Sequence, residues 1–136
     1  LTLVLFFNFG KFRPSSIEWP HSYSREWDQL QVWARANTPT DSLFLTLPHR
    51  VGFRIRSQRA IVAEIKDGSS GLYSYDLAKK WQERISDTHP LAFKTAAEII
   101  KLKQKYQADY LVTFNQVIYR DFTPVFKTDT FIIYEL

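Results

Sequence analysis

The sequence predicts an α/β fold: a single-domain layered sandwich with a largely parallel central sheet flanked by helices. Two observations support this fold class. Segments whose apolar residues recur at helical spacing alternate with short, continuously apolar runs, which is the order expected when helices connect parallel strands. The length of 136 residues, with 45% hydrophobic residues, suits one domain with a substantial core. The last strands could add an antiparallel edge to the sheet.

The first half of the expected domain contains a helix and two apolar strands. Residues 26–36 carry apolar side chains at helical spacing behind Ser24, a potential N-cap. This helix should stop before Pro39, because a proline disfavours helical geometry in the preceding residue. Residues 43–47 and 60–65 are short apolar runs with the length and flanks of buried strands. The rest of the chain is organised around this stretch.

The second half continues the alternation of helices and strands. Residues 67–71 are expected to be flexible, and Asp76 is a potential N-cap for a helix over residues 77–85. Residues 95–106 show the clearest helical pattern, with an apolar stripe and a lysine-rich outer face, and residues 108–114 predict a buried strand behind it. The remaining expected elements are strands at residues 117–122 and 131–136, joined by a turn at residues 123–130.

The composition excludes several classes of site. The chain has no Cys, which rules out disulfides, thiolate chemistry and cysteine-based zinc sites. Its 3 His residues have no acidic or His neighbour at ligand spacing, so neither a metal site nor a catalytic constellation is predicted. Glycine-rich phosphate-binding motifs are absent from the sequence, and we expect no cofactor. The formal net charge of +4 is mild and scattered, and the pattern does not indicate nucleic-acid binding.

The N-terminal end has the features of a tether. Residues 1–7 are almost entirely apolar, but a complete membrane span needs about 20 apolar residues, so this run cannot cross a bilayer alone. Because the chain has no Met and opens on Leu1, we expect it to be a fragment of a longer polypeptide. One interpretation makes residues 1–11 the end of a transmembrane helix or an apolar tether, and the other makes residues 1–7 a core strand. Residues 12–24 are then a linker, and residues 25–136 a soluble α/β domain.

Two short strings resemble a known class of domain. WARANTPTDSLF at residues 33–44 combines a helix end, an Asn-Thr-Pro turn and a strand, and KYQADYLVTF at residues 105–114 enters a strand in a similar way. Over residues 27–114 the chain resembles the soluble C-terminal domain of polytopic bacterial membrane proteins, namely glycosyltransferase-C-like and related families. The resemblance implies an extracytoplasmic domain beside a membrane-embedded module, which often transfers sugar from a lipid-linked donor. The Trp-Trp-Asp acceptor-peptide motif of the oligosaccharyltransferase members does not occur here, so that role is not carried over.

The densest basic cluster consists of Arg50, Arg54, Arg56 and Arg59. Ligands in open α/β sheets bind beyond the carboxyl ends of strands, and guanidinium groups suit phosphate or carboxylate, so the cluster is a candidate anion site. The anion could be a lipid phosphate or the pyrophosphate of a sugar carrier. The alternative is structural. Residues 53–57 alternate apolar and basic side chains, as in a half-exposed strand whose arginines merely solvate one face.

Three functions are open at this point. The first is a non-catalytic extracytoplasmic domain of a membrane-anchored bacterial protein, which contacts the membrane through its N-terminal segment. The second is an accessory part of the active site of a lipid-linked sugar glycosyltransferase, in which the arginine cluster contacts the phosphate or sugar of the donor. The third is an independent soluble α/β protein that binds an anion. No catalytic residue, metal ligand or nucleic-acid partner is predicted in any of them.

Overall fold

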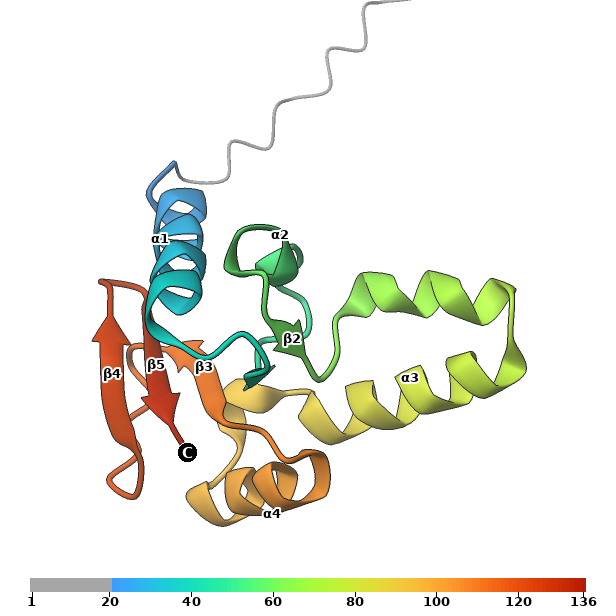
Figure 1. Ribbon diagram of the computed structural model, residues 1–136. Coiled ribbons are helices and arrows are strands. Elements are labelled where there is room, and N and C mark those ends of the chain that lie inside the picture. Colours follow the sequence, from blue (N-terminus) through green and yellow to red (C-terminus); the bar gives the residue numbers. More distant parts are fainter. Residues whose placement is uncertain (1–20) are drawn as a thin grey trace, which may run out of the picture.

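The structure, a computed structural model, describes residues 21–136, with side chains from Arg25 onward. Its centre is a 5-stranded sheet with the strand order β2-β1-β3-β5-β4 (Figure 1). β1 pairs in parallel with β2 and β3, whereas β5 runs antiparallel to both β3 and β4. The strands are β1 (Leu43–Leu45), β2 (Ala60–Ile61), β3 (Tyr110–Phe114), β4 (Thr123–Lys127) and β5 (Phe131–Glu135).

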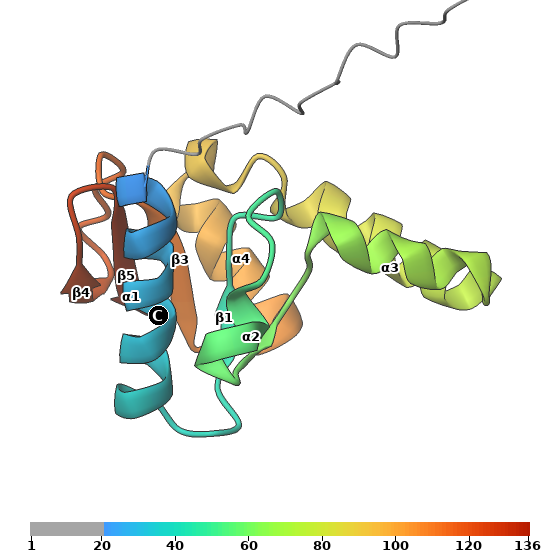
Figure 2. The same cartoon turned by 90° about the horizontal axis from the view of Figure 1, so that it is seen from above.

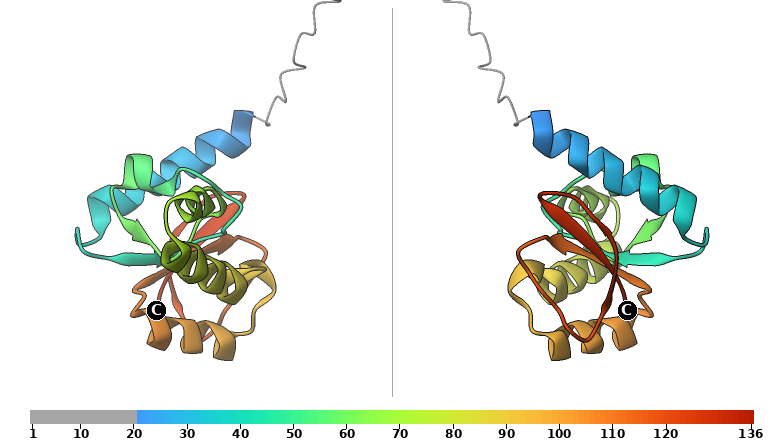
Figure 3. Two further views of the ribbon diagram at one scale, coloured as in Figure 1. Left: turned by 90° about the vertical axis from the view of Figure 1, so that its right-hand side faces the viewer. Right: turned by 90° about the vertical axis from the view of Figure 1, so that its left-hand side faces the viewer.

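Helices cover both faces of this sheet. α1 (His21–Asn37) and the short α2 (Phe53–Ser57) lie on one face, and α4 (Ala96–Tyr106) lies on the other (Figure 3). Fully burying one large apolar side chain stabilises a fold by about 1.5–3 kcal/mol, so the core is the main source of stability. Its largest fully buried apolar and aromatic side chains are Leu30, Phe44, Leu45, Phe53, Leu91, Ile99, Leu111, Phe131, Ile133 and Tyr134.

α3 (Tyr75–Thr88) projects away from the sheet. The 3-10 helix η1 (Ile65–Leu72) runs alongside it in the opposite direction, and together they form a helical arm (Figures 1 and 2). Ser74 caps α3, because its hydroxyl oxygen accepts a hydrogen bond from the Leu77 backbone N–H at 3.4 Å. A second 3-10 helix, η2 (Leu91–Phe93), leads from the arm to α4.

α1 is held by one apolar face and has a defined end. Trp27, Leu30 and Ala34 recur at helical spacing, and all three are buried. The helix ends where the Thr38 hydroxyl donates a hydrogen bond to the Ala34 carbonyl oxygen at 2.6 Å, one residue before Pro39. The predicted helix and its predicted stop are therefore confirmed.

The predicted α/β class is confirmed, as is the antiparallel edge, but the sheet is not largely parallel. Of its strand pairings, β1 with β2 and β1 with β3 are parallel, and β3 with β5 and β4 with β5 are antiparallel. The reason lies in the C-terminal hairpin, in which β5 inserts between β3 and β4. The sheet is therefore mixed.

Residues 53–57, predicted as a half-exposed strand, form the helix α2 instead. Their apolar and basic residues alternate, but the helix buries Phe53 and Ser57, one turn apart, and leaves Ile55 72% exposed. Gly52 precedes the helix with a φ of 88°, a left-handed conformation that favours glycine. In so short a segment, alternation does not distinguish a strand from a single helical turn.

Strand β4 also lies elsewhere than predicted. Residues 117–122 do not form a strand, and β4 occupies the segment predicted as a turn. The missing N–H of Pro124 is tolerated because β4 is at the edge of the sheet. The pairing of β4 with β5 is also irregular between Pro124 and Phe126. An edge strand with such a break gives only a weak sequence pattern.

Several element boundaries differ from the prediction. Of residues 60–65, only the first two form a strand, β2, and the segment 67–71 belongs to η1. α3 is capped by Ser74 and not by Asp76. α1 begins before Ser24, so that residue lies inside the helix. Caps and 3-10 turns depend on a few local hydrogen bonds, which the apolar pattern does not encode.

The predicted tether, residues 1–11, and residues 12–20 of the predicted linker lie outside the described residues. The rest of that linker, residues 21–24, belongs to α1. Within residues 21–136, none of the helices combines the length and the apolar character needed to cross a membrane.

Candidate functional site

A pocket opens at the edge of the sheet where the parallel strands β1 and β3 end. We call it the carboxyl-edge pocket. It has a volume of about 370 Å³, and its walls come from the loop after β1, the segment between α3 and α4, and the last residue of β3. This is the edge at which open α/β sheets usually bind ligands. Most of the lining is apolar: Leu47, Pro48, Pro90, Leu91, Ala92, Phe93 and Phe114.

The polar side chains of the pocket are His49, Arg50 and His89. The two imidazole rings meet edge to face, with centroids 4.6 Å apart and planes inclined by 73°. The guanidinium carbon of Arg50 lies 5.8 Å from the ring centroid of Phe131, a cation–π contact. Burial lowers the pKa of Arg50 to about 10, so this group is still cationic at neutral pH. A mostly apolar pocket with one cation suits an anionic group that is joined to an apolar one.

Hydrogen bonds from neighbouring elements fix the loop that carries two of these polar groups. The indole N–H of Trp27, from α1, donates to the Val51 carbonyl oxygen at 3.2 Å. The carboxylate of Glu64, which follows β2, accepts a hydrogen bond from the Gly52 backbone N–H. Arg50 is therefore held in a formed loop, which reduces the conformational entropy that a ligand would have to remove on binding.

Glu64 is the centre of an ion-pair network beside the pocket. Its side chain is 1% exposed and forms ion pairs with Arg54 at 3.3 Å and Lys66 at 3.7 Å. Arg54 also forks onto Asp67, with Nη1 donating to Oδ1 at 2.8 Å and Nη2 to Oδ2 at 2.7 Å. These hydrogen bonds to Asp67 raise the pKa of Arg54. The carboxylates of Glu64 and Asp67 thus already bind Arg54 within the protein.

Arg59 lies inside the protein and is only 6% exposed. Its Nη2 donates to the carbonyl oxygens of Arg35 at 2.8 Å and Thr38 at 2.6 Å, and its Nε donates to the Thr38 hydroxyl at 3.0 Å. Its Nη1 donates to the carbonyl oxygens of Ser57 at 3.3 Å and Gln58 at 3.2 Å. The last carbonyls of a helix have no partner within the helix, so Arg59 caps the C-terminal end of α1. Its role is structural.

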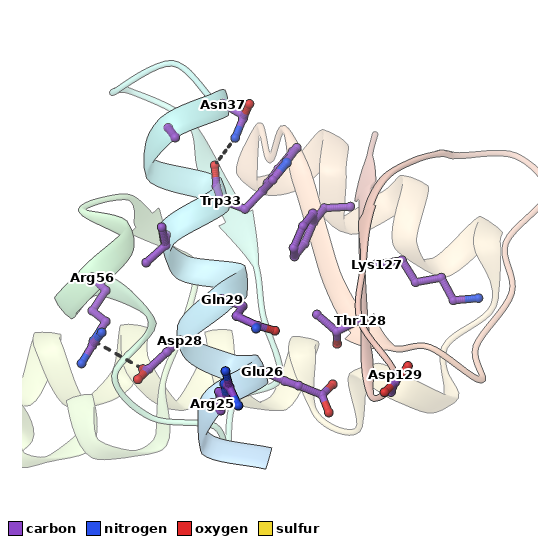
Figure 4. A pocket seen from close by; sticks show the side chains of 13 residues that line it. Arg25, Glu26, Asp28, Gln29, Trp33, Asn37, Arg56, Lys127, Thr128 and Asp129 are labelled. Carbon is purple, nitrogen blue, oxygen red and sulfur yellow. Dashed lines mark hydrogen bonds and ion pairs between the residues drawn. The ribbon is translucent and has the colours of Figure 1, made fainter. Parts of the chain in front are cut away.

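Arg56 lies at a second hollow, the groove between α1 and β4, where it pairs with Asp28 at 3.5 Å (Figure 4). The groove has a volume of about 840 Å³, and its apolar part includes Trp33 and Phe126, whose rings stack at 5.2 Å. Although this hollow is larger than the carboxyl-edge pocket, charges of both signs surround it, so it does not favour an anion. These charged residues are Arg25, Glu26, Asp28, Arg56, Lys127 and Asp129.

The structure does not bring the predicted arginines together around one pocket. Arg50 lines the carboxyl-edge pocket, whereas Arg54 does not line it and pairs with Glu64, which binds the Gly52 N–H of the same loop. Arg56 borders the groove, and Arg59 is buried at the end of α1. Binding of an anion by any of them stays a prediction, but the placement singles out Arg50.

Sequence reasoning did not pair His49 with His89, because the fold alone brings their two segments together. A weak signal was present, since each is adjacent to a proline at the expected end of a strand or helix. Two buried hydroxyls near the same edge of the sheet, those of Thr46 and Thr113, have no hydrogen-bond partner within the part of the chain that the structure describes. In residues 21–136 no group of three or more acidic or His side chains is placed to hold a metal ion.

Comparison with known proteins gives a match over part of the chain. A family model described as a domain of unknown function, DUF6798, matches residues 25–88. The matched segment runs from α1 to the end of α3 and includes the loop that carries His49 and Arg50, whereas Phe114 and the C-terminal hairpin lie beyond it. No curated protein and no solved structure matches the chain.

Proposed function

We propose that this domain binds, without catalysis, an anionic ligand that also has an apolar part, and that the ligand occupies the carboxyl-edge pocket. The observation that carries the proposal is the place of Arg50, a cation in a formed loop at the end of β1, lining a mostly apolar pocket. A guanidinium can make paired hydrogen bonds with phosphate or carboxylate. Partial burial strengthens such a contact, because the surrounding protein screens charges less than water does.

The two parts of the ligand would be held by different forces. Burial disfavours the charged form of Arg50 and lowers its pKa to about 10. A bound anion would offset this cost and raise that pKa again. An alkyl chain on the apolar lining adds about 0.8 kcal/mol for each CH₂ group that leaves water. An alkyl phosphate therefore fits the pocket better than inorganic phosphate does.

The proposal sharpens the first function considered above, a non-catalytic extracytoplasmic domain of a membrane-anchored bacterial protein. Residues 1–11 would hold the domain near a bilayer, where lipid phosphates and lipid-linked sugars are concentrated. The likeness to soluble domains of glycosyltransferase-C-like proteins supports the same setting. A more specific candidate is an accessory part of a lipid-linked sugar transferase site. The observation that favours it is the combination of a cation and an apolar lining, which suits the phosphate and chain of a lipid-linked donor.

Isothermal titration calorimetry of the full chain with inorganic phosphate and octyl phosphate tests the proposal. We expect octyl phosphate to bind at least roughly tenfold more tightly than phosphate, because part of its chain is buried. Arg50→Gln should abolish the binding of both compounds. The matched control is Arg56→Gln, which should leave binding unchanged. Equal affinities of the unaltered chain and Arg50→Gln would overturn the proposal.

The pH dependence of octyl phosphate binding provides a further check on Arg50. Burial lowers the pKa of this group to about 10, so Arg50 is charged well below that pH and loses its charge above it. Octyl phosphate affinity should therefore decline as the pH rises through about 10, under conditions where circular dichroism shows that the chain is still folded. An affinity that rises across this range would contradict binding of the anion by a cationic group.

A further inference from the structure

The tip of the helical arm carries an exposed apolar surface. Leu72, Tyr73 and Tyr75 are 84%, 89% and 80% exposed, and Leu77 is 47% exposed. They lie at the turn between η1 and α3, at the far end of the arm (Figures 1 and 2). Single exposed apolar residues are normal, but a group at the end of a projecting element indicates a contact surface. We call these four residues the arm tip.

Close packing within the arm holds the tip in a defined position. A Cβ added at Gly68 would lie 2.7 Å from the Trp81 ring, and one added at Gly71 would lie 2.8 Å from the Cβ of Ala78. Both glycines therefore allow η1 to approach α3 closely. The indole N–H of Trp81 donates to the Glu64 carbonyl oxygen at 3.1 Å, which joins the arm to the segment after β2. The packing within the arm and its hydrogen bond to the segment after β2 therefore hold the arm tip in place.

Two lysines follow the tip in α3. Lys79 and Lys80 are exposed, and within residues 25–136 no ion pair joins either of them to a carboxylate. Helical side chains lean toward the N-terminus of their helix, which here is the direction of the arm tip. Asp76 lies in the first turn of α3, where a carboxylate complements the helix dipole. The end of the arm therefore combines apolar side chains with cations that are available to an anionic surface.

We propose that the arm tip inserts into the headgroup region of a bilayer that contains anionic lipids. Tyrosine rings favour this region because one end is apolar and the other polar, and the leucines can reach the acyl chains. The lysines would add attraction to anionic headgroups. A protein partner would have to supply a surface shaped to the tip, whereas a bilayer needs no complementary shape. No residue of the arm tip lines the carboxyl-edge pocket, so this proposal is independent of ligand binding there.

Site-directed spin labelling of the full chain tests the proposal. Because the chain has no Cys, Tyr73→Cys creates a single site for a nitroxide label. Ile118→Cys is the matched control, since Ile118 is also apolar and is 79% exposed in the connection between β3 and β4. Each labelled chain is mixed with vesicles of equal parts phosphatidylcholine and phosphatidylglycerol. Relaxation of the label by dissolved oxygen and by a water-soluble nickel complex then reports its depth in the bilayer.

We expect vesicles to reduce the nickel accessibility of the label at position 73 several-fold and to raise its oxygen accessibility, with little change at position 118. Adding Lys79→Gln and Lys80→Gln should weaken this effect, whereas adding Arg56→Gln, which removes a cation of α2 that lines neither the arm nor the carboxyl-edge pocket, should not change it. The proposal is overturned if the label at position 73 stays in water, or if both labels change equally. It is also overturned if only an added protein, and not the vesicles, protects position 73.

Discussion

Arg59 and Arg50 come from the same basic stretch of sequence but occupy opposite kinds of environment. Arg59 is buried at the C-terminal end of α1, and carbonyl oxygens from α1 and from the end of α2 accept its N–H groups. Arg50 lies in the loop after β1, where it borders a mostly apolar pocket and has a pKa lowered by burial to about 10. The first guanidinium supports the fold, and the second is placed to hold a ligand.

The comparison shows that the density of arginines in a sequence is a poor guide to the arginine that binds. Arg54 and Arg56 belong with Arg59, because carboxylates of the protein already bind them. What distinguishes Arg50 is its position at the carboxyl end of a parallel strand and the apolar lining beside it. The position that the fold gives to each cation therefore decides between a structural and a functional role.

The largest effect is expected from Arg59→Met. This substitution leaves the buried Thr38 carbonyl oxygen and the partly buried Arg35 carbonyl oxygen without their donor, so the free energy of unfolding should fall by about 3 kcal/mol or more. Urea unfolding followed by circular dichroism measures the change. The matched control is Arg56→Met, which removes an exposed ion pair and should cost less than about 1 kcal/mol. Equal effects of the two substitutions would contradict the distinction between the two roles.

Glu64→Gln should have an intermediate effect on two properties, the free energy of unfolding and the affinity for octyl phosphate. It removes the buried negative charge that faces Arg54 and Lys66, so we expect the free energy of unfolding to fall by about 2 kcal/mol. It also weakens the acceptor for the Gly52 N–H, so octyl phosphate affinity should decrease as the loop loosens. Urea unfolding and calorimetry measure the two changes. Asp28→Asn, which breaks the exposed pair with Arg56, serves as control and should alter neither by much.

The elements that could be predicted from the sequence are those with strong local patterns. The helix that stops before Pro39 and the capped helix α4 have apolar residues at helical spacing. The strands β1 and β3 lie in continuous apolar runs. α2 could not be predicted, because five residues fit either period, nor could β4, because an edge strand with Pro124 has no apolar alternation. Periodicity thus identifies elements that bury a continuous face and misses short or marginal ones.

Only part of the candidate site could be predicted from the sequence. The loop after the first buried strand was predicted as a ligand position, and Arg50 lies there. His89 and Phe93 reach the same pocket from the segment that follows the arm, and no local pattern indicates this. The arm tip was missed because residues 67–71 were interpreted as flexible, whereas close glycine packing makes them part of η1. Long-range packing, which a single sequence does not display, decides both features.

The most direct test of the central claim is a nitrogen-15 chemical-shift titration of the full chain with octyl phosphate. If Arg50 and the carboxyl-edge pocket bind the ligand, the largest shifts should occur at residues 47–50 and 89–93, with much smaller ones at residues 54–59. The account would be contradicted if residues 54–59 or the groove between α1 and β4 shifted most, because the ligand would then bind away from Arg50 and the carboxyl-edge pocket.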